Sequence, residues 1–371
     1  MVRKYELLLD DSIGFLGQKL FRIRALINFG DVKAGDLGGY IQSYKNLSHD
    51  GYAWVADNTK VKGKAKISGN ALVSDRAEVF GDVKVTDNAQ VSDSSRIVGN
   101  AKVYGNAKVY GNALLTDFAE VEGNAKVYGN ARIFDYAKVE GEAQVTGTAR
   151  VFGNAEVSSR AKVFGNSKVS GRAKVFGYAD VSGNAQVFGN SKVSGTAEVT
   201  ENSKVFGNAR VRSDGNVSGN AEVWGNAKVS GSVEVSDSAQ IFGNAKLYNR
   251  VRVFGYAEVS GNAEVSNDAE IFGNAKLYDD VQVSGNMKVS GNSEVCGNAQ
   301  VSKSGDILVF ENHFSSGPYV TYTRSNKMWK DGDFYGTGQE LIEVACRDSN
   351  NFGALYKAYV GFVETLEEQV L

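Results

Sequence analysis

The chain has 371 residues with 41 basic and 43 acidic side chains, so a net charge of −2 excludes a strong overall attraction to nucleic acid or anionic lipid. Its two cysteines, Cys296 and Cys346, exclude a disulfide framework and agree with a reducing compartment. The N-terminus lacks an apolar leader, and no stretch approaches the roughly 18 apolar residues of a membrane span. We therefore expect a soluble, cytoplasmic protein.

Residues 1–54 are predicted to form an N-terminal β cap. Residues 5–9 and 20–28 have the apolar patterns of strands, and residues 30–41 are a turn-rich segment. The repetitive region that follows would otherwise expose backbone edges and apolar core at its first coil. A cap at this end would prevent end-to-end stacking.

A six-residue repeat fills the middle of the chain. From Val55 to Val301 an aliphatic residue recurs at every sixth position without an insertion, which makes 42 hexads. Many hexads read V-F-G-N-A-K or V-S-G-N-A-E, and the run A-K-V-F alternates inward and outward residues as a short strand does. The G-N pair suits a corner, because both residues tolerate the left-handed backbone region. Residues 55–306 are thus predicted to form one solenoid.

The aliphatic-x-x-x-small-x pattern resembles that of the hexapeptide-repeat family. This resemblance implies an all-β solenoid, a left-handed parallel β-helix of about 14 three-sided coils with three hexads in each. A flat solenoid with two hexads per coil is the alternative, because phenylalanine recurs in every second hexad from Phe152 to Phe188. Further on, aromatic residues recur in every third hexad, as expected for stacking on a three-sided prism, at Phe188, Phe206, Trp224 and Phe242.

Two further runs carry a narrower resemblance. The run G-D-V-K-A-G-D-L-G-G-Y-I at 30–41 and the run D-G-Y-A-W-V-A-D at 50–57 are similar to the start of the YdcK-like branch of hexapeptide-repeat proteins and of related phage and prophage proteins. Activity in that branch is mostly assumed from the fold, so the resemblance implies little about catalysis.

Residues 307–371 are predicted to form a separate C-terminal α+β domain. Strands are expected at 306–310, 319–324 and 328–334, followed by helices near 339–347 and 352–370. The run F-Y-G-T-G-Q-E-L-I from Phe334 resembles domains appended to phage-borne proteins. We interpret this domain as a cap or an oligomerisation unit through which a protein partner could bind.

The repeat offers no catalytic residues. Hexapeptide-repeat acyltransferases typically use a histidine as general base, and a protruding loop often helps to form the acceptor pocket. Here the two histidines, His49 and His313, lie outside the hexads, and no loop interrupts them. Outward acidic residues alternate with basic ones, as in cross-strand charge pairs, so we expect no metal site and no cofactor.

Sorting the outward positions so that every third hexad shares a face predicts one face that is both aromatic and basic. Such a face fits self-association as a homotrimer, or the binding of a nucleotide whose base stacks on rings while cations take its phosphates. The residues assigned to this face are Phe152, Phe188, Phe206, Trp224 and Phe242 with Lys174, Lys192, Arg210, Lys228 and Lys246.

These observations lead to three hypotheses about function. The first is a non-enzymatic, oligomeric binding protein of phage or prophage type that sequesters a nucleotide immune signal in the cytoplasm of a bacterial host cell. The second, from another class, is a structural scaffold or virion-associated rod whose faces are dry and fully paired with themselves. The third is a hexapeptide-repeat acyltransferase, which the lack of a histidine in the hexads argues against.

Overall fold

The computed structural model describes residues 3–311, 319–348 and 350–370, and His313 lies outside these ranges. The chain divides into two compact units, Met1–Gly207 and Asn208–Leu371. In both units short strands pair in parallel with the strands three hexads later, for example Lys126 with Gln144 and Glu234 with Arg252. A coil therefore holds three hexads. This spacing confirms the three-sided β-solenoid and contradicts the flat form with two hexads per coil.

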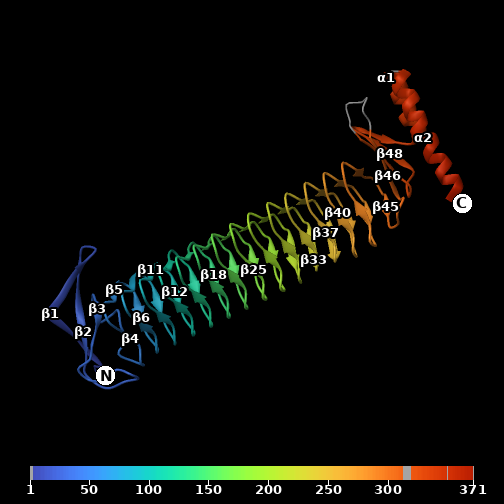
Figure 1. Ribbon diagram of the computed structural model, residues 1–371. Helices are drawn as coiled ribbons and strands as arrows, with labels where there is room; N and C mark the ends of the chain where they lie inside the picture. Colours follow the sequence, from blue (N-terminus) through green and yellow to red (C-terminus); the bar gives the residue numbers. More distant parts are fainter. Residues whose placement is uncertain (1–2, 312–318, 349, 371) are drawn as a thin grey trace. The chain divides into compact units, whose positions relative to one another are not determined.

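Three parallel sheets, numbered by their first strands, form the solenoid of unit 1, and successive strands of each sheet follow one another along it (Figure 1). Sheet 1 contains β4 (Trp54–Val55), β7 (Leu72–Val73), β10 (Gln90–Val91), β13 (Lys108–Val109), β16 (Lys126–Val127), β19 (Gln144–Val145), β22 (Lys162–Val163), β25 (Asp180–Val181) and β28 (Glu198–Val199). Sheet 2 contains β5 (Lys60–Gly63), β8 (Glu78–Gly81), β11 (Arg96–Gly99), β14 (Leu114–Leu115), β17 (Arg132–Ile133), β20 (Arg150–Val151), β23 (Lys168–Val169), β26 (Gln186–Val187) and β29 (Lys204–Val205). Sheet 3 contains β6 (Lys66–Ile67), β9 (Lys84–Val85), β12 (Lys102–Val103), β15 (Glu120–Val121), β18 (Lys138–Val139), β21 (Glu156–Val157), β24 (Lys174–Val175) and β27 (Lys192–Val193).

Unit 2 has strands of the same three kinds. Each is assigned to sheet 1, 2 or 3 by its position in the six-residue repeat. Those of sheet 1 are β31 (Asn216–Val217), β34 (Glu234–Val235), β37 (Arg252–Val253), β40 (Glu270–Ile271) and β43 (Lys288–Val289). Those of sheet 2 are β32 (Glu222–Val223), β35 (Gln240–Ile241), β38 (Glu258–Val259), β41 (Lys276–Leu277) and β44 (Glu294–Val295). Those of sheet 3 are β30 (Arg210–Arg212), β33 (Lys228–Gly231), β36 (Lys246–Asn249), β39 (Glu264–Val265), β42 (Gln282–Val283) and β45 (Gln300–Val301).

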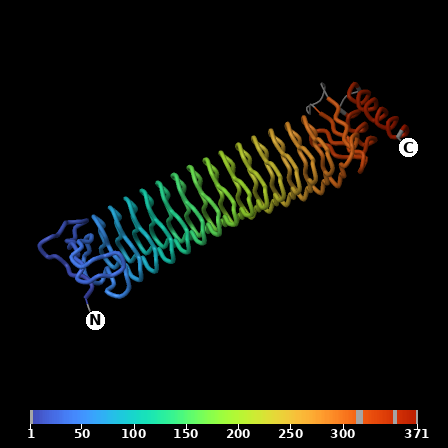
Figure 2. The backbone as a smooth tube through the Cα atoms, turned by 60° about the horizontal axis from the view of Figure 1, so that its bottom comes forward, coloured from blue at the N-terminus to red at the C-terminus, as the bar shows by residue number. Residues whose placement is uncertain are grey.

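The core of each unit lies inside its coils, which Figure 2 draws as stacked turns of the backbone. Within a hexad the small and aliphatic residues point inward and the residue between them points outward. Ala161 and Val163 are fully buried, whereas Lys162 is exposed. Burying one such valine contributes about 1.5–3 kcal/mol. A strand of two residues cannot be stable alone, so the fold depends on the stacking of coil upon coil.

The corners use the left-handed backbone region in two ways. Gly147 has φ +68°, and a Cβ there would lie 2.8 Å from the backbone nitrogen and oxygen of Gly165 on the next coil. Asp93, in the same corner column, has φ 57°, and its carboxylate accepts the N–H of Gly111 at 2.8 Å. Close approach thus favours glycine, while aspartate is accepted where its side chain binds the next corner.

The N-terminal segment begins with β1 (Tyr5–Phe15) and β2 (Gln18–Ala25), which form an antiparallel hairpin. β3 (Leu37–Ile41) pairs antiparallel with β2 and parallel with β5. The end of the turn-rich segment 30–41 is thus a strand, which the sequence pattern did not indicate. Its two glycines allow close packing: a Cβ on Gly38 would lie 2.5 Å from the Val55 carbonyl oxygen.

The C-terminal part of unit 2 is the predicted small α+β fold. Its antiparallel sheet has the order β46 (Ile307–Glu311), β47 (Tyr319–Thr323), β48 (Met328–Asp331) and β49 (Phe334–Gly336), followed by α1 (Gly338–Asp348) and α2 (Asn350–Val370). Trp329, Leu341 and Tyr356 pack in one buried cluster between sheet and helices. Neither helix is long and apolar enough to span a membrane, within the residues that the structure describes.

The hexad that contains Gly215 keeps the register of the repeat. Val211 and Val217 on either side are fully buried, and Gly215 occupies the position of the usual alanine. A Cβ there would lie 3.1 Å from Val211 and 3.4 Å from Val229. This glycine is therefore a variant of the small position and not an inserted residue.

The corner geometry predicts the order of two substitutions at Gly147. Gly147→Ala should lower the free energy of unfolding by about 1–2 kcal/mol, because a Cβ is forced into the left-handed region against the next coil. Gly147→Asp should cost less, because its carboxylate can accept the Gly165 N–H as Asp93 does for Gly111. Denaturant unfolding of both variants checks this, and an aspartate variant less stable than the alanine variant would contradict it.

Candidate functional site

The structure divides the predicted aromatic and basic residues between two sheets. In unit 1 the aromatic residues come directly after strands of sheet 2, whereas the cations begin strands of sheet 3; unit 2 has the same arrangement. Between Phe188 and Lys192 the chain turns a corner at Gly189, where φ is +74°. The prediction that the aromatic residues and the cations share one face is therefore wrong, because the chain turns a corner between each aromatic residue and the cation that follows it. The aromatic residues are Phe152, Phe188, Phe206, Trp224 and Phe242, and the cations are Lys174, Lys192, Arg210, Lys228 and Lys246.

The aromatic rings stack on one another along the coils. Phe188 and Phe206 lie 4.8 Å apart between ring centroids with an interplanar angle of 3°. Trp224 and Phe242 lie 4.5 Å apart at the same angle. The spacing of about 4.8 Å between hydrogen-bonded strands imposes this face-to-face arrangement. A base could not enter between two such rings unless the backbone opened.

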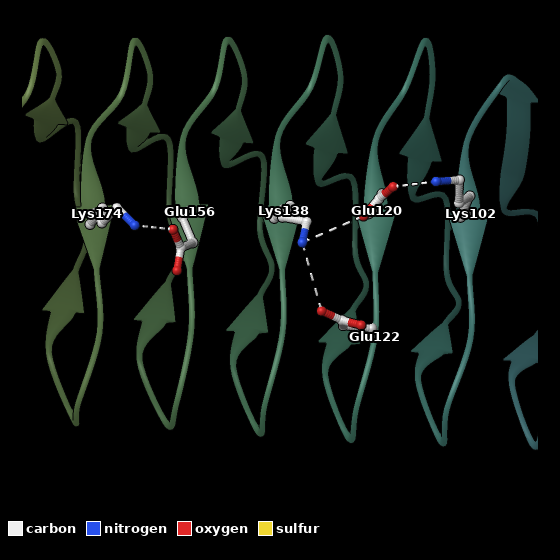
Figure 3. Close-up of polar contacts among 6 residues, drawn as sticks. All are labelled: Lys102, Glu120, Glu122, Lys138, Glu156 and Lys174. Carbon is white, nitrogen blue, oxygen red and sulfur yellow. Dashed lines mark hydrogen bonds and ion pairs between the residues drawn. The ribbon is translucent and has the colours of Figure 1, made fainter.

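Many outward cations are paired with carboxylates along the same sheet (Figure 3). Lys102 binds Glu120 at 2.6 Å, and Lys138 lies 3.6 Å from the other oxygen of Glu120. The hydrogen bond from Lys102 lowers the pKa of Glu120. Two of the predicted site residues are held in the same way: Lys174 by Glu156 and Lys246 by Glu264. Such exposed pairs each contribute little to stability, but they occupy the charges that a phosphate would need.

Sequence analysis missed a second basic run, which lies beside aromatic residues of sheet 2. Arg132, Arg150 and Lys168 begin β17, β20 and β23 and are direct neighbours in register. Phe134 and Phe152 follow the first two strands, and their rings stack at 4.8 Å. The sequence contains the signal for this run, because a cation directly precedes an inward aliphatic residue in every third hexad.

A cavity of about 240 Å³ opens beside this run. Its lining residues are Leu114, Thr116, Arg132, Ile133, Phe134 and Arg150. Larger cavities of about 610 Å³ and 540 Å³ lie in unit 2. The larger one contains the Arg250–Asp268 ion pair, and the other has an acidic rim at Glu364, Glu367 and Glu368.

His49, the candidate general base among the described residues, is engaged in the N-terminal segment. Its Nδ1 accepts the backbone N–H of Lys4 at 3.3 Å, and its ring stacks on Tyr5 with centroids 4.4 Å apart. Burial lowers the pKa of His49, and the charges of Lys4 and Arg3 lower it further. These contacts give the imidazole a packing role. No group of three or more potential metal ligands occurs within the ranges described above.

Comparison with known proteins adds the fold alone. No protein-family model matches the chain, and no curated protein matches it. Among solved structures it is similar to UDP-N-acetylglucosamine acyltransferase of Arabidopsis, with 13% sequence identity, 53% of this chain and 71% of that chain covered, and a TM-score of 0.40. This is a distant likeness between β-solenoids and says nothing about activity.

The buried amine of Lys4 predicts an unusual pH dependence. Lys4 donates to the carbonyl oxygens of Gly51 and Ala53 at 3.2 and 2.9 Å, and burial lowers its pKa from 10.5 to about 8, against a smaller raising effect of Asp50. Between these values the unfolded chain holds the proton and the folded chain releases it. Stability should therefore rise with pH, by about 1–2 kcal/mol from pH 8 to 9.5.

Denaturant unfolding of the wild type and Lys4→Met across this range tests the prediction. Burial raises the pKa of Tyr5, which acts in the opposite direction above pH 10, so the measurement stops at pH 9.5. The rise should be present in the wild type and absent in the variant. Equal slopes for the two proteins would show that Lys4 is not its source.

Proposed function

We propose that this protein is a non-catalytic structural scaffold, whose outward side chains serve mainly to hold coil to coil. The observation that carries the proposal is the pairing of outward groups with their counterparts on the next coil. Asn70, Asn88 and Asn106 form a ladder in which each amide nitrogen donates to the next amide oxygen, at 3.0 and 3.0 Å, and Asn106 continues it to Asn124 at 3.1 Å.

The same rule governs charges and rings. Lys60, Glu78 and Arg96 form an alternating ladder at 3.1 and 3.2 Å. Tyr110 and Tyr128 stack with an interplanar angle of 2°. Each contact is weak in water, but it recurs on coil after coil and points along the solenoid. Outward side chains that already bind the next coil form the self-paired faces expected of a scaffold.

The other two hypotheses depend on the placement of specific side chains. Acyl transfer needs a general base within reach of an acceptor, and the contacts of His49 with Lys4 and Tyr5 favour packing instead. Capture of a nucleotide is the second candidate, because Arg132, Arg150 and Lys168 are adjacent and no described carboxylate pairs with them.

A scaffold built from equivalent coils should tolerate the loss of one coil. Deleting residues 100–117 removes one whole coil and keeps every later hexad on its sheet. We expect this variant to keep the β-type circular dichroism spectrum and a cooperative melt. Deleting residues 100–116 leaves Asp117 as one extra residue at the corner after Gly99, and should be less stable than the whole-coil deletion because the chain has to bulge there. Loss of the cooperative melt in the whole-coil deletion, or a whole-coil variant no more stable than the shorter deletion, would refute interchangeable coils.

Native mass spectrometry tests the absence of acyltransferase chemistry. The full-length protein is mixed with coenzyme A or acetyl-coenzyme A, and we expect the mass of the bare protein in both cases. The same spectra give the oligomeric state. Stoichiometric coenzyme A adducts, or acyl transfer that His49→Gln abolishes, would overturn a purely structural role.

A further inference from the structure

The run formed by Arg132, Arg150 and Lys168 departs from the alternating ladders. These residues begin consecutive strands and pair side by side in register, about 4.8 Å from one strand to the next. All three side chains are exposed. No hydrogen bond or ion pair to a carboxylate is described for them in residues 3–311, 319–348 and 350–370.

The neighbours in the same column do not neutralise this run. Leu114 precedes Arg132 in register, and Gln186 follows Lys168. Earlier in the column, by contrast, Glu78 lies between two cations and binds both. Like charges directly opposite each other are destabilising. Three adjacent cations without a carboxylate therefore form a surface whose repulsion an external anion would relieve.

An open aromatic face lies next to these cations. Phe152 covers one face of Phe134 at 4.8 Å. On the other side, the preceding coil has Thr116 in the position where a third ring would stand, and the 240 Å³ cavity opens there. The hydroxyl of Thr116 donates to Asp117 at 2.7 Å, so it is turned to its neighbour. The cavity thus combines a ring face, an aliphatic wall at Leu114 and two guanidinium groups.

We propose that this surface binds a nucleoside triphosphate, with its base stacked on the open face of Phe134 above Thr116 and its phosphates along Arg132, Arg150 and Lys168. A planar base can replace the missing third ring at the stacking distance. Guanidinium groups bind phosphate oxygens in pairs, and Lys168 adds a third cation for the end of the chain. A single phosphate would use only part of a run that spans roughly 10 Å. The site is independent of the scaffold role, since it uses exposed residues only.

Isothermal titration calorimetry of the full-length protein tests the site with ATP, adenosine and inorganic tripolyphosphate. We expect ATP to bind with a Kd of about 1 mM or lower. Tripolyphosphate should bind more weakly, and adenosine should give no signal at these concentrations. Arg150→Gln should weaken both phosphate ligands by about tenfold or more. Phe134→Ala should weaken ATP about 5- to 150-fold and leave tripolyphosphate unchanged.

Lys84→Gln is the matched control, because Lys84 is an exposed cation on sheet 3 that pairs in register with Lys66 and Lys102. It removes the same charge and should leave ATP affinity unchanged. Circular dichroism confirms that each variant is folded. The proposal is overturned if ATP does not bind, if Lys84→Gln weakens ATP as much as Arg150→Gln, or if Phe134→Ala weakens ATP and tripolyphosphate equally.

Discussion

Backbone hydrogen bonds between successive coils are the constraint on which the rest of this structure depends. The nitrogen of Lys102 donates to the carbonyl oxygen of Ala119 at 2.9 Å, and the nitrogen of Lys126 donates to that of Ala143 at the same distance. Because these bonds repeat at every strand, each side chain lies about 4.8 Å from the equivalent residue of the next coil. Inside, this spacing stacks valine on valine and alanine on alanine. Outside, it places each outward side chain beside the equivalent side chain of the next coil.

The surface chemistry follows from that spacing. Identical amides become hydrogen-bonded ladders, opposite charges become ion pairs, and rings become parallel stacks. A functional site on such a surface therefore begins where a column fails to pair with itself. Arg132, Arg150 and Lys168 form such an unpaired column, and the ring stack of Phe134 and Phe152 beside them ends at Thr116. Departure from the ladder is thus a better guide to function here than the abundance of any residue type.

The solenoid also needs partners for the backbone groups at its ends. At the start, β3 pairs antiparallel with the hairpin and parallel with the first full coil, and the buried amine of Lys4 donates to two carbonyl groups. At the other end, within unit 2, the hydroxyls of Thr321 and Ser325 accept the N–H groups of Glu294 and Gln300 at 3.1 and 2.7 Å. The segments on either side of the repeat thus cap it by supplying hydrogen bonds that another coil would have made.

The sequence by itself determined the repeat, the three-sided coil, the inward residues and the order of C-terminal strands and helices, because each is set by local periodicity or by spacing along the chain. It did not determine β3, since the value of Gly38 lies in its contact with Val55, a residue distant in sequence. It also misassigned the basic partner of the aromatic column, because a corner at Gly189 separates Phe188 from Lys192. Only the tertiary structure decided which outward residues share a sheet, which charges are already paired, and which ring keeps an open face, because these depend on contacts across coils and not on neighbours in the chain.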